Sequence, residues 1–173
     1  KITDLDIRNY KSIHQIHLQD IENALILVGQ NNTGKTTVLD AIRAVGGAYR
    51  IRPEDFGEDG ANIEIGITLS FTEDDLRLLH RKGIVSQYRR WDAWSADFQK
   101  KLPSYKDGLL PFTMTANRNG RIRLKDGFSK HNPCIPEVFP KIYHVDTERR
   151  LEQLQSDLLL LQEDEILQHM RSD

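Results

Sequence analysis

One short run of residues has the types and the spacing of a phosphate-binding loop. It reads glycine, four intervening residues and then Gly-Lys-Thr, in the segment Gly29-Gln30-Asn31-Asn32-Thr33-Gly34-Lys35-Thr36. Backbone N–H groups of such a loop converge on phosphate oxygens, and the N-terminus of the following helix adds positive potential. The two glycines permit the turn of the backbone and its close approach to the phosphates. The run therefore predicts a nucleotide-binding site.

The residues of this loop have separate expected roles toward ATP and Mg²⁺. We expect Lys35 to bridge the β- and γ-phosphates and the Thr36 hydroxyl to ligate Mg²⁺. Thr37 would contact the α-phosphate. The rest of the phosphate cradle would come from Gly29, Asn31, Asn32, Thr33 and Gly34.

The residues on either side of the loop predict the strand and the helix that position it. The apolar run Ala24–Val28 is typical of a strand buried on both faces. From Thr36 the apolar residues follow helical spacing, and Gly46-Gly47 supplies the stop. A glycine-rich turn that only caps a helix would lack this context, which makes the nucleotide-site interpretation specific.

The N-terminus and the loop together resemble a known group of ATPases. The alternation over residues 2–10 and 13–18 predicts two short strands around a polar turn. The turn and the end of the first strand carry the motif Leu5-Asp-Ile-Arg-Asn-Tyr-Lys-Ser-Ile13. With Asn31 and the run Thr37-Val-Leu-Asp-Ala-Ile42, this resembles the ABC-type ATPase heads of the SMC, RecF and OLD (overcoming lysogenisation defect) families. The wording Asn-Asn-Thr-Gly-Lys-Thr and the later Arg52-Pro-Glu-Asp-Phe56 look more like the OLD group.

The resemblance implies an α/β fold, the N-terminal lobe of a P-loop ABC-type head with a mixed or antiparallel sheet. It implies that Lys11 and Ser12 approach the nucleotide phosphates, although a solvated turn is the alternative. We expect this lobe over 1–146, with a helical insertion at about 73–102 and a hairpin at about 112–125. Residues 147–173 would be a helix that starts a coiled-coil arm. The chain starts at Lys1 rather than at a methionine, and it ends where the resembling heads insert a long helical arm. We therefore expect a fragment of a longer protein.

Three elements of such heads, the Q-loop, the signature and the Walker B strand, find no clear match. By position Asp146 would stand where the Q-loop reaches Mg²⁺, although a helix N-cap explains it as well. Leu158–Glu165 has helical heptad spacing, and Gly66–Asp74 alternates, so we reject both as Walker B strands. The catalytic residues therefore stay unknown, and we expect the fragment to hydrolyse ATP poorly.

Between the P-loop region and the C-terminal helix, the sequence predicts further local structure. Ile63–Phe71 alternates as a half-buried strand, and Thr72 is the expected N-cap of the next helix, with Asp75 three residues on. A second helix is expected from about Ser86 to Lys101, with Tyr88, Trp91, Trp94 and Phe98 packed in the core. Asn119-Gly120 predicts a hairpin with a type I′ turn.

The resemblance also implies partners and an activity for the full-length protein. Two heads would sandwich ATP as a homodimer, and hydrolysis would be coupled to DNA processing. In an OLD protein a Toprim nuclease follows, so the whole would be an ATP-dependent endonuclease. On and just after the expected hairpin lies a cluster of cations, Arg118, Arg121, Arg123, Lys125 and Lys130. The cluster could contact a DNA backbone, or it could only protect the edge of the hairpin. A complete small P-loop kinase and a non-catalytic ATP-gated assembly module remain as alternatives.

Composition limits the remaining function classes. The 173 residues fit about one domain, and the net charge of −2 does not support a strongly basic nucleic-acid binder. No apolar run approaches the roughly 18 residues that a membrane span needs. The single cysteine, Cys134, excludes an internal disulfide framework and a zinc cluster. That usage suits a reducing compartment, and we expect a cytoplasmic protein.

Overall fold

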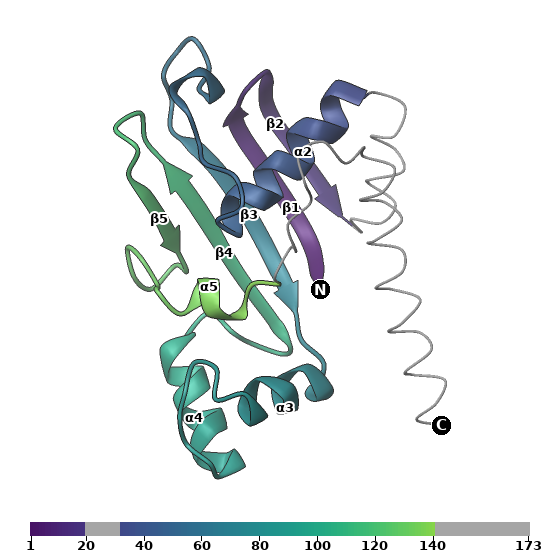
Figure 1. Cartoon of the computed structure of the whole chain (residues 1–173), viewed down its shortest axis with the longest axis vertical. Coiled ribbons are helices and arrows are strands. Elements are labelled where there is room, and N and C mark those ends of the chain that lie inside the picture. The colour runs from purple at the N-terminus through teal and green to yellow at the C-terminus, as the bar shows by residue number, and fades with distance from the viewer. Residues whose placement is uncertain (20–31, 141–173) are drawn as a thin grey trace.

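A computed structural model describes residues 1–19 and 32–140, with the backbone alone for 32–36. The described strands form one antiparallel sheet in the order β2-β1-β3-β4-β5 (Figure 1). The strands predicted over 24–28 and 142–145, and the helix predicted from 147, lie outside the described residues. The parallel part of a mixed sheet is therefore not tested. The bounds of the five strands are β1 Ile2–Tyr10, β2 Ile13–Gln19, β3 Ile63–Ser70, β4 Leu109–Ala116 and β5 Ile122–Lys125.

The inner face of the sheet holds the core because every second residue of the central strands is apolar. In β3, Ile63, Ile65, Ile67 and Leu69 are all at most 2% exposed, as the alternation predicts. Helix α2 (Asn32–Val45) crosses this face, and the short α5 (Ile135–Val138) packs beside it (Figure 1). The core side of α2 consists of Val38, Ala41, Ile42 and Val45.

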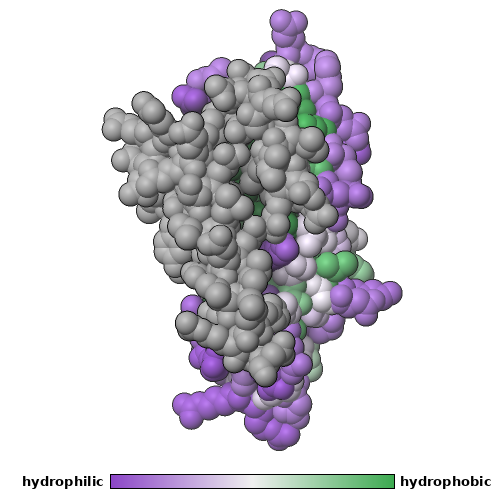
Figure 2. All heavy atoms as spheres, turned by 90° about the vertical axis from the view of Figure 1, so that its right-hand side faces the viewer, coloured by the Kyte–Doolittle hydropathy of each residue, from purple (hydrophilic) through white to green (hydrophobic). Residues whose placement is uncertain are grey.

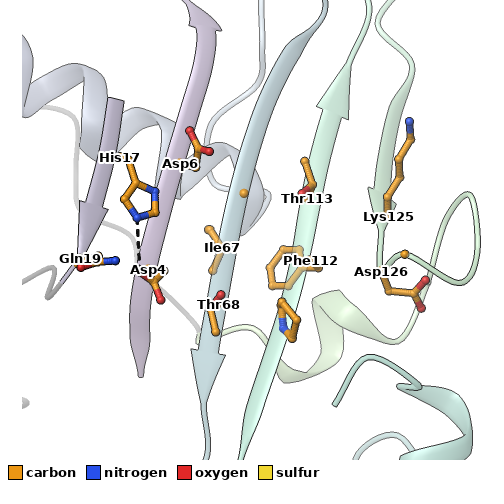
Figure 3. Close-up of a pocket in the computed structure, with 13 residues that line it drawn as sticks. Asp4, Asp6, His17, Gln19, Ile67, Thr68, Phe112, Thr113, Lys125 and Asp126 are labelled. Atoms are coloured by element: carbon orange, nitrogen blue, oxygen red, sulfur yellow. Dashed lines mark ion pairs between the residues drawn. The ribbon is translucent and has the colours of Figure 1, made fainter. Parts of the chain in front are cut away.

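The outer face of the sheet is polar. Asp4 and Asp6 of β1, His17 of β2, Thr113 of β4 and Lys125 of β5 line a shallow hollow there (Figure 3). His17 Nε2 lies 3.8 Å from Asp4 Oδ1, and both side chains are largely exposed. A sheet with one apolar face and one polar face suits an antiparallel arrangement.

The predicted C-terminal end of α2 and the predicted start of α3 (Glu73–Arg81) are confirmed by their capping bonds, whereas α2 begins at Asn32, earlier than the expected Thr36. After α2, Ala48 N–H donates to Arg43 O and Gly47 N–H to Ala44 O, with Gly47 at φ +80°, which is a Schellman motif. At the start of α3, the Thr72 hydroxyl accepts from Asp75 N–H at 3.1 Å. The Asp75 carboxylate accepts in turn from Thr72 N–H at 2.8 Å. This reciprocal pair is a capping box.

The second helix of the insertion starts later than the expected Ser86. It is α4 (Trp91–Lys101), and Val85 stands before it in the left-handed region at φ +70°. A helix cannot run through such a residue. Trp94 and Phe98 are buried as expected, but the expectation that Tyr88 packs in the core is wrong, because Tyr88 is 58% exposed.

The hairpin between β4 and β5 is confirmed, but its predicted type I′ turn is wrong. That turn needs positive φ at both Asn119 and Gly120, and only Gly120 has it, at +80°. Gly120 N–H donates to Asn117 O, and Asn117 N–H to Arg121 O. The loop therefore has three residues, with the glycine alone in the left-handed position.

Candidate nucleotide-binding site

The predicted phosphate-binding residues continue directly into α2. This helix begins at Asn32, so Asn32–Thr36 form its N-terminal end, while Gly29 and Asn31 lie outside the described residues. The first N–H groups of a helix have no acceptor within it. No acidic side chain stands in this first turn to compete for them. The end of the helix is thus suited to hold the anionic phosphates of a nucleotide.

Burial of the next turn fixes α2 against the sheet. Thr37 is 5% exposed, and Val38 and Ala41 are at most 2% exposed. A helix held by buried side chains directly after its binding end cannot shift easily, since its apolar stripe has one complementary surface. The position of the backbone N–H groups is therefore set by the core.

Lys11 lies against α2, where its ammonium meets a carboxylate. Lys11 Nζ is 3.0 Å from Asp40 Oδ2, and Arg43 Nη1 is 3.2 Å from Asp40 Oδ1. Asp40 follows Thr36 by four residues, which is about one helical turn. Of the two residues that the resemblance assigned to the phosphates, Lys11 is thus brought to the P-loop helix. Ser12 follows it in the same turn and is exposed.

The backbone of Lys11 is held in an unusual conformation. Its φ is +53°, in the left-handed region that costs an L-residue roughly 1–2 kcal/mol. Lys11 N–H donates to Asp55 O at 2.7 Å, so the η2 turn (Pro53–Asp55) fixes this conformation. Strain of this kind persists only where the surroundings hold it, and it gathers at functional sites.

The surroundings keep the Lys11 ammonium charged. Burial by itself lowers the pKa of Lys11, but the hydrogen bond and the charge of Asp40 outweigh it. The pKa of Lys11 therefore lies above its ordinary value. The ammonium also lies over two aromatic rings, 5.3 Å from the centroid of Tyr10 and 5.2 Å from that of Tyr49. This corner of the molecule offers a fixed cation.

A buried carboxylate behind Lys11 escaped the sequence analysis. Asp55 is 2% exposed, and both its carboxylate oxygens lie 3.0 Å from the Tyr49 hydroxyl. Arg52 N–H donates to the same carboxylate at 2.9 Å. The resemblance singled out residues 52–56, but only the fold shows that they anchor the turn that carries Lys11.

The Tyr10 hydroxyl lies in the same region. Tyr10 is fully buried, and its hydroxyl forms no hydrogen bond with any residue that the structure describes. Burial and the neighbouring Tyr49 and Asp55 raise the pKa of Tyr10 far above its ordinary value, so the hydroxyl stays protonated. Its role is to fill the core below Lys11.

The rejected Walker B candidate at the end of β3 lies far from this corner. Arg8, near the Lys11 end of β1, pairs with Glu64 at the start of β3, whereas Ile2 pairs with Leu69. The acidic residues that follow β3 are thus about eight strand residues away from Lys11, or roughly 26 Å. Glu73 and Asp74 are also exposed in the first turn of α3. They do not belong to the candidate site.

The cations of the hairpin lie on an edge strand rather than near α2. β5 ends the sheet, and Arg123 and Lys125 pair across from Thr115 and Thr113. Arg118 Nη2 donates to Gly57 O at 3.0 Å, so it serves a contact within the chain. Charges on an edge strand oppose pairing with other chains.

Two further predictions fall partly or wholly outside the described residues. Asp146, the candidate second Mg²⁺ ligand, is not described, and neither is the side chain of Thr36. Among residues 1–19 and 32–140, no three His, Cys, Asp or Glu side chains gather as a metal site. In the same part of the chain, no helix has the length and apolar character to cross a membrane.

Comparison with known proteins gives one family match. The family model described as an AAA ATPase domain matches residues 1–170. No curated protein matches the chain.

Proposed function

The chain belongs to the AAA ATPase domain family, and we propose that residues 29–37 are the ATP·Mg²⁺ site of this ATPase domain. The observation that carries the assignment is the start of α2 within the P-loop motif, with Lys11 fixed one turn further along the helix. Bound ATP·Mg²⁺ supplies the phosphoanhydride bond whose hydrolysis the domain serves.

The chain's own residues would divide the work of holding the nucleotide. The backbone N–H groups at the start of α2 and the Lys35 ammonium would hold phosphate oxygens, and the Thr36 hydroxyl would be a ligand of Mg²⁺. Lys11 adds a second cation on the side of α2, and Asp40 sets its direction. Orientation and charge neutralisation are the main contributions a protein makes to phosphoryl transfer.

The resemblance of residues 2–45 to SMC, RecF and OLD heads supports a finer proposal. ATP binding brings two copies of the domain together, and hydrolysis separates them. In the full-length protein this cycle is coupled to DNA processing, with an endonuclease as effector. A complete small P-loop kinase would instead transfer the phosphoryl group to a substrate, and a non-catalytic module would dimerise with ATP without turnover.

The test is a titration with a fluorescent ATP analogue and Mg²⁺, with phosphate release measured in the same samples. We expect binding that Lys35→Ala weakens at least about tenfold, because a charge-assisted phosphate contact contributes about 1.5–3 kcal/mol. Lys106→Ala is the control, since Lys106 is an exposed lysine on the loop before β4.

The outcomes of this titration separate the three functions. Binding that depends on Lys35, with phosphate release at full length, supports the ATPase assignment. Binding with dimerisation and no release at full length supports the non-catalytic module, and phosphoryl transfer to an added acceptor supports a kinase. Equal binding by wild type and Lys35→Ala would place the nucleotide elsewhere and refute the assignment.

A further inference from the structure

One segment of the helical insertion is far more basic than the rest of the chain. Between Leu76 and Trp91 there is no aspartate or glutamate, although the whole chain has a net charge of −2. The segment carries five cations, which are Arg77, Arg81, Lys82, Arg89 and Arg90. We call residues 77–90 the basic loop.

Contacts around His80 bring the two ends of the basic loop together on one surface. His80 Nε2 lies 2.7 Å from Arg89 O, and its ring packs 5.5 Å from that of Trp91. The Arg77 guanidinium lies over the Trp91 ring at 3.7 Å. Arg81 follows Arg77 by four residues on α3 and so shares its side of the helix. All five cations are exposed.

The surface lies at one end of the molecule. Figure 1 places α3 and α4 below the sheet, away from the β1–β2 turn that carries Lys11. Figure 2 shows hydrophilic side chains projecting at this lower end. The acidic residues of α3 occupy its first turn, whereas the basic loop begins near its other end.

Several of these cations have no acidic partner in the part of the chain that the structure describes. Arg77 pairs with Glu73 at 3.3 Å, and Arg90 with Asp92 at 2.8 Å. Within the described residues, Arg81, Lys82 and Arg89 form no ion pair. Free cations that gather on an otherwise slightly acidic protein are available to an anionic partner.

An aromatic side chain stands among these cations. Tyr88 is 58% exposed and directly precedes Arg89 and Arg90. Its ring could have joined the Trp91–Trp94–Phe98 stack, as its spacing predicts, but the backbone turns away before α4. An exposed ring beside cations is the combination on which nucleic-acid bases stack.

The loop that presents Tyr88 is held rigidly. Val85, a β-branched residue at φ +70°, is strained, and its carbonyl accepts from Lys101 Nζ at 2.8 Å. Ile84 O accepts from Trp94 Nε1 at 3.2 Å, and Gly83 O from Gln87 Nε2 at 3.0 Å. These hydrogen bonds offset the strain at Val85, which would not persist in an unsupported loop. A loop already ordered loses less conformational entropy when it binds a partner.

We propose that the basic loop binds single-stranded nucleic acid, with its arginines and lysine on the phosphates and Tyr88 stacked on a base. Four of the five cations are arginines, whose planar fork suits phosphate oxygens. Stacking on Tyr88 requires an unpaired base, which selects single strands over duplex. This inference rests on the proposed function only for the choice of DNA as the probe.

The test measures binding of fluorescein-labelled oligothymidylate by fluorescence anisotropy, without nucleotide, over a series of salt concentrations. We expect Arg81→Ala/Arg89→Ala to lower the slope of log K against log salt by about 1.4, since each phosphate contact on a single strand contributes about 0.7. We expect Tyr88→Ala to weaken binding about 5- to 150-fold, as loss of one stacked base does.

A matched double variant on the hairpin, Arg121→Ala/Lys130→Ala, removes the same charge from two other exposed cations. It should leave the salt slope within about 0.3 of wild type. A slope reduced equally by both double variants would overturn the proposal, and so would duplex DNA bound as tightly as the single strand. Binding to phosphatidylserine vesicles that needs the same arginines, without oligonucleotide binding, would overturn it in favour of a lipid surface.

Failure of this inference and failure of the proposed function give different results. Lys35→Ala should weaken nucleotide binding at least about tenfold and leave oligothymidylate binding unchanged. The Arg81→Ala/Arg89→Ala variant should do the reverse, with an unchanged circular dichroism spectrum. Loss of both activities in either variant would mean that the two sites are not separate, which contradicts the assignment of the basic loop.

Discussion

Two tyrosines near Lys11 differ in a way that single substitutions can measure. The Tyr49 hydroxyl donates to the buried Asp55 carboxylate, whereas the buried Tyr10 hydroxyl has no hydrogen-bond partner among residues 1–19 and 32–140. Tyr49→Phe should lower the free energy of unfolding by about 1–3 kcal/mol, because it leaves a buried charge with one bond fewer. Tyr10→Phe should leave that free energy unchanged or raise it by about 1 kcal/mol, since it removes an unsatisfied polar group.

Urea unfolding of both variants beside wild type measures this difference. Each change removes one oxygen from a ring that otherwise stays in place, so each tyrosine serves as the control for the other. A loss at Tyr10→Phe as large as at Tyr49→Phe would mean that the Tyr10 hydroxyl has a partner in solution.

Asp126 predicts a dependence of stability on pH. Its carboxylate accepts bonds from Asn132 Nδ2 at 2.8 Å and from Ser129 and Phe128 N–H, which order the loop after β5. Burial raises the pKa of Asp126, but these bonds outweigh it and hold the pKa below its ordinary 3.8. The stabilisation is complete above 3.8 and is lost as pH falls through the lower value in the folded protein.

Asp126→Asn should therefore lower the free energy of unfolding by about 1–3 kcal/mol at neutral pH, because its amide presents N–H groups to donors. The gap to wild type should narrow in acid, below 3.8. Urea unfolding at several pH values measures it. A difference in the free energy of unfolding between wild type and Asp126→Asn that stays constant down to low pH would mean that the charged Asp126 carboxylate is not the stabilising group.

At the scale of elements, the sequence predicts the structure correctly where periodicity and capping act locally. The strand over Ile63–Phe71 and the capped helix after Thr72 were both predictable, since their signals lie within a few residues. The late start of α4 was not, because Lys101 and Trp94 hold the loop around Val85 from across the insertion. Tertiary bonds of this kind override local helical spacing.

The candidate site likewise combines features that are local in sequence with contacts that only the fold creates. Lys35 and Thr36 belong to a contiguous motif, so the sequence alone predicts roles for them. The contact of Asp40 with Lys11 was not predictable, since Lys11 stands 29 residues earlier in the chain. The sheet brings the β1–β2 turn to α2, and no spacing rule encodes that contact.

Two glycines test how closely the elements pack. A Cβ added at Gly46 would lie 3.1 Å from Phe139 Cε1, a buried ring that packs on Phe112 at 6.2 Å. A Cβ at Gly66, on the outer face of β3, would meet Asp6 Cβ and Thr113 Oγ1 at 3.5 and 3.6 Å, ordinary contact distances. Gly46→Ala should lower the free energy of unfolding by about 1–3 kcal/mol.

Gly66→Ala should raise the free energy of unfolding by about 0.5–1 kcal/mol, because alanine loses less backbone entropy in a strand. Neither glycine has a positive φ, so the two substitutions differ in the space around the new Cβ and not in backbone conformation. Thermal unfolding of the pair measures both shifts. Changes of the same sign would show that packing at Phe139 does not govern Gly46.

At the scale of the whole molecule, the sheet and the P-loop helix are joined at Lys11, whereas the basic loop lies at the other end. Lys11 contacts α2 through Asp40 and the η2 turn through its own N–H. The basic loop follows β3, whose end lies beside the start of β1. A nucleotide bound at α2 should therefore act on the stability of the chain through Lys11 and not through the basic loop.

ATP·Mg²⁺ at 100 times its Kd should stabilise the wild-type fold by about 2.7 kcal/mol, because only the folded chain binds it. If Lys11→Met weakens binding tenfold, the stabilisation at the same ATP concentration falls to about 1.4 kcal/mol. Lys82→Met, which removes a cation from the basic loop, should keep the full effect. Differential scanning fluorimetry with and without ATP measures each variant against its own baseline, which removes the direct cost of losing the Lys11–Asp40 pair. Equal nucleotide stabilisation of Lys11→Met and wild type would show that Lys11 serves only to fasten the turn to α2.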